Sequence, residues 1–158
     1  MKDIFSTNAN KASSKVTINS FMMGSLFFVL TLIWTLNPSK FSLFIVAQIV
    51  LAIPMLFVSS LAYAKIGYWE KVELWDILGW FTNNTGSIFI LNAVGLITAQ
   101  IYEGVAVCYF LLLIILMALY SIINVVYKRK TLKEKIFKFA FFVIILTLGG
   151  ILPLVFKI

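Results

Sequence analysis

Residues 105–127 read VAVCYFLLLIILMALYSIINVVY, an almost purely apolar stretch without a charged side chain. A helix of about 20 apolar residues is enough to cross the ~30 Å hydrocarbon core of a bilayer. This stretch meets that requirement. It is therefore predicted to be a transmembrane helix, and it guides the interpretation of the rest of the chain.

The whole chain shares this apolar character. Hydrophobic residues make up 62% of the 158 positions, and charged residues make up 12%. Soluble domains hold about 45–50% apolar and about 25% charged residues. A soluble fold of this size cannot hide the excess apolar surface in one core, so the composition predicts an all-α integral membrane protein.

Four further apolar runs accompany the first. The predicted bundle of five transmembrane helices covers about residues 17–36, 41–64, 84–102, 105–127 and 136–156. These spans form a single predicted transmembrane domain, residues 17–158, which follows a polar cytoplasmic segment, residues 1–16. The third and fourth spans are joined by a tight turn at Tyr102–Gly104, which places Glu103 at the membrane surface.

Lysine and arginine are divided unequally between the two sides of this bundle. With the N-terminus in the cytoplasm, 11 of the 13 lie on the cytoplasmic side, and only Lys40 and Lys157 lie on the other. Cytoplasmic loops of membrane proteins carry such an excess. The sequence therefore predicts an N-in/C-out protein of the plasma membrane, or of the inner membrane if the source is bacterial.

Residues 66–82, between the second and third spans, read IGYWEKVELWDILGWFT. This segment is too charged to span a bilayer and too apolar for a free loop, and it holds three of the four tryptophans. Because Trp settles at the headgroup level, we predict a Trp-rich helix in the cytoplasmic interface. Glu70, Glu73 and Asp76 recur at intervals of three and are expected to pair with the basic loop at 128–138.

The third span carries a polar face. At 100° per residue its small and polar residues gather on one side: Asn84, Ser87, Gly95 and Thr98, with Asn92 at the edge. The second span has a weaker face with Gln48 and Ser59. Polar side chains avoid lipid, so these faces either pack helix against helix through hydrogen bonds or line a path for a solute.

Most residue types that carry site chemistry are missing from the sequence. It has no histidine, and Cys108 is its only cysteine. This excludes Ser-His and Cys-His catalysis, an intrachain disulfide and the usual zinc and haem ligand sets. The sequence predicts no enzyme activity, no cofactor and no metal site.

The net charge of +7 sits in short segments beside apolar runs. This placement favours an orientation signal over a nucleic-acid site, so the bilayer is the predicted partner and nucleic acid is not. The densest run supplies five candidate contacts for anionic lipid headgroups: Lys128, Arg129, Lys130, Lys133 and Lys135.

Two functions from different classes fit this sequence. The first is a small channel or transporter subunit that acts as a homo-oligomer, with the path between subunits because five spans leave little room inside one chain. The second is a non-transporting anchor, sensor or accessory subunit of a membrane partner. The polar faces favour the first, which is the preferred hypothesis. The near-absence of charge within the spans favours the second, because coupled transporters usually need an ionisable residue there.

Overall fold

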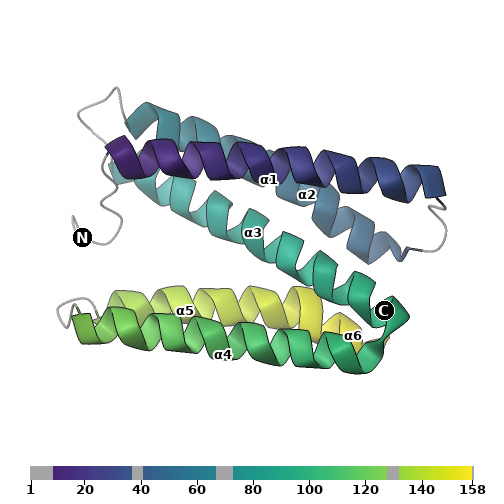
Figure 1. Cartoon of the computed structure of the whole chain (residues 1–158). Coiled ribbons are helices and arrows are strands. Elements are labelled where there is room, and N and C mark those ends of the chain that lie inside the picture. Colours follow the sequence, from purple (N-terminus) through teal and green to yellow (C-terminus); the bar gives the residue numbers. More distant parts are fainter. Residues whose placement is uncertain (1–8, 37–40, 67–72, 128–131, 158) are drawn as a thin grey trace. The chain divides into compact units, whose positions relative to one another are not determined.

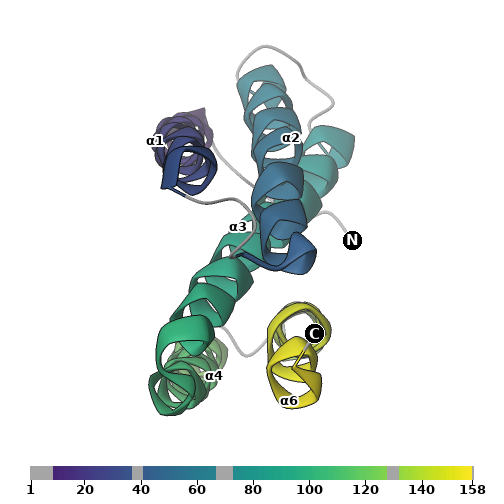
Figure 2. The same ribbon diagram turned by 90° about the vertical axis from the view of Figure 1, so that its right-hand side faces the viewer.

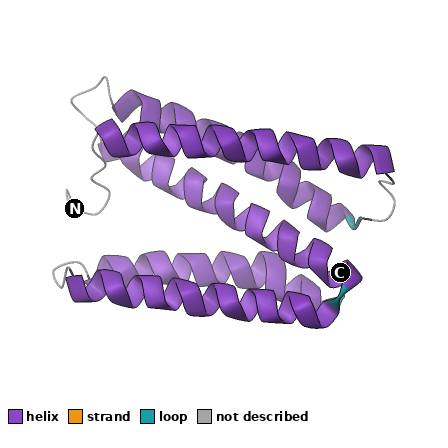
Figure 3. Ribbon diagram, in the orientation of Figure 1, coloured by secondary structure: helices purple, strands orange, loops and turns teal. Residues whose placement is uncertain are grey.

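The computed structural model describes residues 9–36, 41–66, 73–127 and 132–157 (Figure 1). Among these, all but Phe41, Ser42, Tyr102 and Lys157 are helical (Figure 3). In chain order the helices are α1 (Ala9–Leu36), α2 (Leu43–Ile66), α3 (Glu73–Ile101), α4 (Glu103–Tyr127), α5 (Leu132–Leu146), the π-helix η3 (Thr147–Ile151) and α6 (Leu152–Phe156). The predicted all-α class is confirmed.

Five helical segments are long and apolar enough to cross a membrane. They are Asn10–Thr35, Leu43–Ile66, Glu73–Ile101, Glu103–Ile123 and Lys135–Phe156. Their number and order agree with the five predicted spans, because length and composition are what the sequence states most directly.

The chain divides into two compact units, an N-terminal unit (Met1–Ile90) and a C-terminal unit (Leu91–Ile158). α3 contributes its first part to the N-terminal unit and its last part to the C-terminal unit. Residues 17–158, predicted to form one transmembrane domain, are thus distributed over both.

In the N-terminal unit, α1 and α2 lie side by side along seams that repeat every seven residues (Figures 1 and 2). The buried residues of α2 include a run that alternates steps of four and three: Ile45, Ile49, Ala52, Leu56, Ser59, Tyr63 and Ile66. On α1, buried residues recur at intervals of seven: Ala12, Asn19, Leu26 and Ile33. A seven-residue repeat keeps one face of a helix toward the same neighbour along its length.

α3 meets α2 at two glycines that lie seven residues apart. A Cβ placed on Gly79 would lie 3.0 Å from Tyr63 Cε1, and one placed on Gly86 would lie 3.0 Å from Leu56 Cγ. Side chains of α2 therefore rest directly against the backbone of α3. Leu56, which rests against Gly86, is 0% exposed.

The predicted separate Trp-rich helix is wrong for the part of it that the structure describes. Residues 66–82 were predicted to precede a span starting at Asn84, but Glu73–Ile101 is one continuous helix. Residues 67–72 of the predicted segment lie outside the described residues.

The polar side chains near Asn84, where a new helix was expected to begin, form hydrogen bonds within α3. Thr82 Oγ1 donates to the Leu78 carbonyl at 2.7 Å, and Asn84 Nδ2 donates to the Trp80 carbonyl at 2.6 Å. Both side chains bond one turn back along α3, so neither caps a new helix. The described residues of the predicted polar segment 1–16 are likewise helical, because α1 begins at Ala9.

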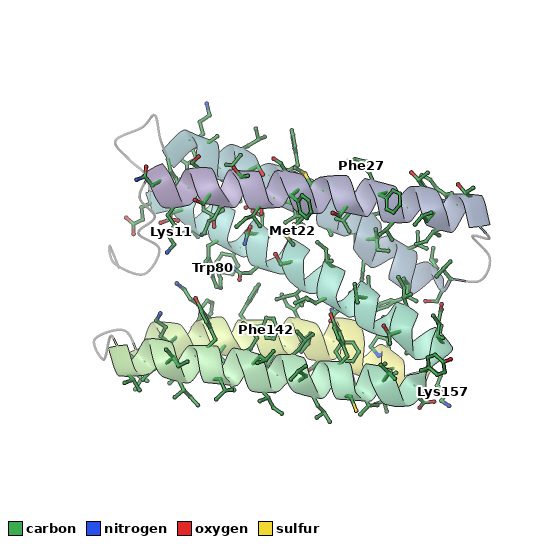
Figure 4. The ribbon with its side chains drawn as sticks, viewed as in Figure 1. Lys11, Met22, Phe27, Trp80, Phe142 and Lys157 are labelled. Atoms are coloured by element: carbon green, nitrogen blue, oxygen red, sulfur yellow. The ribbon has the colours of Figure 1, made fainter. Side chains whose placement is uncertain are left out.

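In the C-terminal unit, α4 and α5 run antiparallel side by side (Figures 1 and 2). Tyr102 alone separates α3 from α4, and its carbonyl accepts the Val105 and Ala106 N–H groups at 3.1 and 3.2 Å. The tight turn predicted here is present. Glu103 opens α4 and lies 3.5 Å from the Nζ of Lys157, with both side chains exposed; Figure 4 labels Lys157 at this end of the unit.

The predicted fifth span, residues 136–156, is not a regular α-helix throughout. α5 passes into η3, where the Leu152 N–H bonds to the Thr147 carbonyl five residues earlier, and α6 follows. Pro153 has no N–H, and its ring would collide in a regular helix with the carbonyl of Gly149. The wider π turn accommodates this ring, and Gly149 and Gly150 present no side chain that resists the change.

The contact of Leu56 with Gly86 predicts which α2 leucine matters for stability. Leu56→Ala should lower the free energy of unfolding in detergent by about 2–5 kcal/mol, because it opens a cavity in a packed interior. The matched change Leu51→Ala, at a side chain that is 49% exposed, should cost much less. Thermal unfolding of both purified variants tests this. Equal losses would show that Leu56 is not packed as described.

Candidate functional site

Asn92 is the most enclosed polar residue of the predicted face of α3. Its side chain is 0% exposed, and its Nδ2 donates to the Ile145 carbonyl of α5 at 3.3 Å. Among the described residues its Oδ1 has no hydrogen-bond partner, and a Cβ on Gly150 would lie 2.6 Å from that oxygen. Asn92 therefore ties α3 to α5, while its oxygen rests against the glycine of η3.

Phe110 of α4 fills the space beside Asn92. Its ring lies so close to Gly95 and Gly150 that a Cβ on either would collide with it: the nearest ring atom would be Cζ for Gly95, and Cε1 at 2.6 Å for Gly150. We call Asn92, Gly95, Phe110, Ile145 and Gly150 the Asn92 cluster. It joins α3, α4, α5 and η3 within the C-terminal unit.

A second aromatic contact supports this cluster. The Tyr109 hydroxyl donates to the Leu91 carbonyl at 3.1 Å, and the Tyr109 and Phe110 rings meet edge to face at 5.5 Å between centroids. Successive residues of α4 thus hold the same stretch of α3, one through a hydrogen bond and the other through van der Waals contact.

A hydrogen-bonded chain links the three helices of the N-terminal unit. Asn19 Nδ2 of α1 donates to the Oγ of Ser59 on α2 at 3.1 Å, and that hydroxyl donates to the Gly79 carbonyl of α3 at 3.1 Å. Asn19 and Ser59 are both buried. We call these three residues the Ser59 chain. Buried groups of this kind stabilise a bundle because they satisfy one another where water is excluded.

The remaining residues of the predicted polar faces are placed differently. Gln48 is buried on α2, whereas Asn84, Ser87 and Thr98 are only half-buried. Thr98, like Asn84, bonds to its own helix, through a 2.8 Å hydrogen bond to the Val94 carbonyl. The structure thus brings Asn92 and Gly95 together in one cluster and places Ser59 in the other unit.

The acidic triplet does not share one environment. Asp76 is buried at 2% exposed, whereas Glu73 is exposed and Glu70 lies outside the described residues. Steps of three advance only 300° around a helix, so neighbours in the series are offset by about 60°. Pairing of this triplet with the 128–138 loop stays a prediction.

Two of the predicted lipid-headgroup contacts are described. Lys133 is exposed and Lys135 half-buried in the first turn of α5, while Lys128, Arg129 and Lys130 lie outside the described residues. Cations at a helix N-terminus oppose the helix dipole. Their position is therefore not explained by stabilisation of α5 itself.

Sequence reasoning missed several residues that the structure uses, among them Asn19 and Phe110. Asn19 could have been found, because it stands seven residues from both Ala12 and Leu26 in the α1 seam. The pairing of Phe110 with Gly150 has no sequence pattern, since it depends on how α4 and η3 meet.

Across the described ranges, no group of three His, Cys, Asp or Glu could hold a metal ion.

The Asn92 cluster predicts a glycine-specific effect. Gly95→Ala should destabilise the protein, because the new methyl group would collide with Phe110. Overpacking of this kind typically costs about 1–3 kcal/mol. Phe110→Leu should recover part of the loss in the double variant. Gly104→Ala is the matched control: no atom lies within 4 Å of a Cβ there. Unfolding midpoints in detergent that fall equally for both glycine variants would contradict this packing.

Comparison with known proteins adds no family to this description. The sequence matches no protein-family model, no curated protein and no solved structure. The case for a function therefore starts from the residues and contacts above.

Proposed function

We propose that the protein is an integral membrane protein that crosses the bilayer five times with its N-terminus in the cytoplasm. We further propose that it acts as a non-transporting accessory subunit of a membrane partner. The observation that carries this role is the use of the buried polar side chains: Asn19, Ser59 and Asn92 each hydrogen-bond between helices.

Helix length supports the membrane assignment. α1 and α3 have 28 and 29 residues, so each is about 42–44 Å long at 1.5 Å per residue. That exceeds the ~30 Å of hydrocarbon, and their first turns extend into the interface. Trp75 and Trp80 then lie at the start of the third span, near the lipid headgroups. This is the depth in the bilayer at which Trp is enriched.

The hydroxyl groups of α1 also suit a lipid environment. Six of them donate to the carbonyl four residues earlier in the same helix: Ser14, Thr17, Ser20, Ser25, Thr31 and Thr35. A hydroxyl bonded in this way does not lose a hydrogen bond when it faces hydrocarbon. The exposed face of α1 can therefore contact lipid without a polar partner.

The accessory role rests on where polar and apolar surfaces lie. The Asn92 Nδ2 and the Ser59 hydroxyl form hydrogen bonds between helices. Polar groups in membrane bundles commonly stabilise helix packing in this way. α4, in contrast, has the smallest buried share of the five candidate spans and exposes Leu112, Ile115 and Leu119. This long apolar face is open to lipid and to the helices of a partner.

A channel or transporter subunit is the second candidate. Ser87 and Thr98 remain half-exposed on α3, so a homo-oligomer could place them along a path between subunits. The hydrogen bond of Thr98 to its own helix weakens this alternative, because that hydroxyl is already satisfied.

The proposed topology predicts a labelling pattern. In a Cys108→Ser background, Ser39→Cys should react with a membrane-impermeant maleimide in intact cells, and Lys130→Cys should react only after permeabilisation. The reason is the excess of Lys and Arg on the cytoplasmic side. Labelling of position 130 but not of position 39 in intact cells would invert the topology.

The accessory role is tested by two measurements on the same protein. Purified protein in a phosphatidylcholine–phosphatidylglycerol bilayer should give no KCl conductance above the protein-free background. A photo-crosslinker at Ile115, which is exposed, should yield one discrete protein adduct in native membranes, whereas the same group at the buried Ala106 should not.

Three results would contradict the accessory role. A conductance altered by Thr98→Leu would favour the channel, and adducts between two copies of this chain would favour a homo-oligomer. Adducts with lipid alone would leave no partner on this face.

A further inference from the structure

The amide of Asn92 contacts the fifth span at two residues that lie five positions apart. Its Nδ2 donates to the Ile145 carbonyl at 3.3 Å, and its Oδ1 lies 2.6 Å from the position that a Cβ would take on Gly150. The Phe110 ring covers the same glycine, with its Cε1 also 2.6 Å from that position. Ile145 and Gly150 therefore face the same neighbours.

This arrangement follows from the π turn of η3. In a regular α-helix, residues four apart lie about 40° apart around the axis, and residues five apart lie about 140° apart. A π turn bonds residues five apart, as the Leu152 N–H does with the Thr147 carbonyl, so it brings Gly150 over Ile145. If α5 continued as a regular α-helix, Gly149 would occupy this place instead.

The two adjacent glycines therefore suit two registers of the helix. In the π register of the structure, Gly150 is buried against Phe110, and Gly149 is half-buried. In an α register, Gly149 would take the place of Gly150, again without a side chain that collides with Phe110 or Asn92. Either register thus places a glycine in the Asn92 cluster.

Pro153 favours the π register. In a regular helix its ring would collide with the carbonyl of Gly149, four residues earlier. This collision opposes the α register and not the π register, in which Pro153 is buried at the start of α6. The proline therefore sets the balance between the two registers, whereas the glycines make both of them compatible with the cluster.

The register also decides which residue of α6 reaches the start of α4. In the π register the Lys157 Nζ lies 3.5 Å from the Glu103 Oε2. Loss of the extra residue from the turn would rotate α6 by about 100° and bring Phe156 to the place of Lys157. A change beside Asn92 is thus transmitted to the exposed end of the unit.

We infer that η3 is a two-register switch in which Gly149 and Gly150 alternate against Phe110 and Asn92. The π register is the more stable form because Pro153 opposes the other. A shift of register turns α6 against α4 without a collision in the Asn92 cluster. π turns within α-helices frequently mark functional sites, where such a local change of register is used.

Cross-linking between α4 and α6 measures the register in the full chain. In a Cys108→Ser background, Glu103→Cys is combined either with Lys157→Cys or with Phe156→Cys, all at exposed side chains. Purified protein in detergent is treated with a short bismaleimide. The parent should cross-link faster through position 157 than through position 156, because α6 is in the π register.

Alanine at each glycine should act in opposite ways on this preference. Gly150→Ala should lower the ratio of cross-linking at 157 to that at 156 about tenfold, because its methyl group would collide with Phe110 and Asn92 in the π register. Gly149→Ala is the matched control. Its methyl group would meet the same side chains only in the α register, so the preference for 157 should remain.

Pro153→Ala reaches the switch by an independent route. Without the ring the α register loses its collision, so cross-linking should move toward position 156. Gly149→Ala in the same chain should return it to position 157 by blocking the α register. A loosened end of the helix would behave differently, because a second alanine would not restore the preference.

Two results would overturn the switch: equal effects of Gly149→Ala and Gly150→Ala on the ratio, or no recovery in the variant that combines Pro153→Ala with Gly149→Ala. If Gly150→Ala does not purify as a folded protein, the Pro153→Ala pair carries the test by itself. An unchanged ratio in Pro153→Ala would then equally overturn the proposal.

Discussion

A polar group enclosed by apolar side chains costs several kcal/mol unless it forms a hydrogen bond, and this constraint organises both units. In the N-terminal unit it is met by the Ser59 chain, which passes from α1 through α2 to a backbone carbonyl of α3. In the C-terminal unit the Nδ2 of Asn92 meets it by donating to the Ile145 carbonyl on α5, whereas the Oδ1 of Asn92 has no hydrogen-bond partner among the described residues. Each bond joins two different helices, so satisfying the polar group also assembles the unit.

Glycines lie beside these bonds where the helices approach closely. Gly79 supplies the carbonyl that accepts from Ser59, and its missing side chain also leaves room for the Tyr63 ring. Gly95 and Gly150 likewise have no side chain and leave room for the Phe110 ring. Small residues at helix contacts are characteristic of membrane bundles, where close packing replaces the hydrophobic effect as the source of attraction.

The sequence predicts the five long apolar helices well because length and apolar composition are local properties. Contacts between side chains are harder to predict from the sequence. Asn92 was placed at the edge of a polar face by regular 100° steps, yet it is the most enclosed member, because α5 and η3 supply its surroundings. The separate Trp-rich helix failed for a related reason: charge at Glu73 and Asp76 suggested a boundary, but the helix continues and buries Asp76 in the unit.

Polar contacts also explain how α1 finds its place on α2. A seam that repeats every seven residues can slide by seven and still bring apolar side chains together. Such a slip would place Ala12 or Leu26 of α1 opposite Ser59 and would leave the amide of Asn19 facing an apolar neighbour. A single buried asparagine is known to fix register in coiled coils by this penalty. Because Lys15 and Asn19 both lie in the first half of α1, the register is set at that end, and Leu26, Leu30 and Ile33 pack wherever that choice puts them.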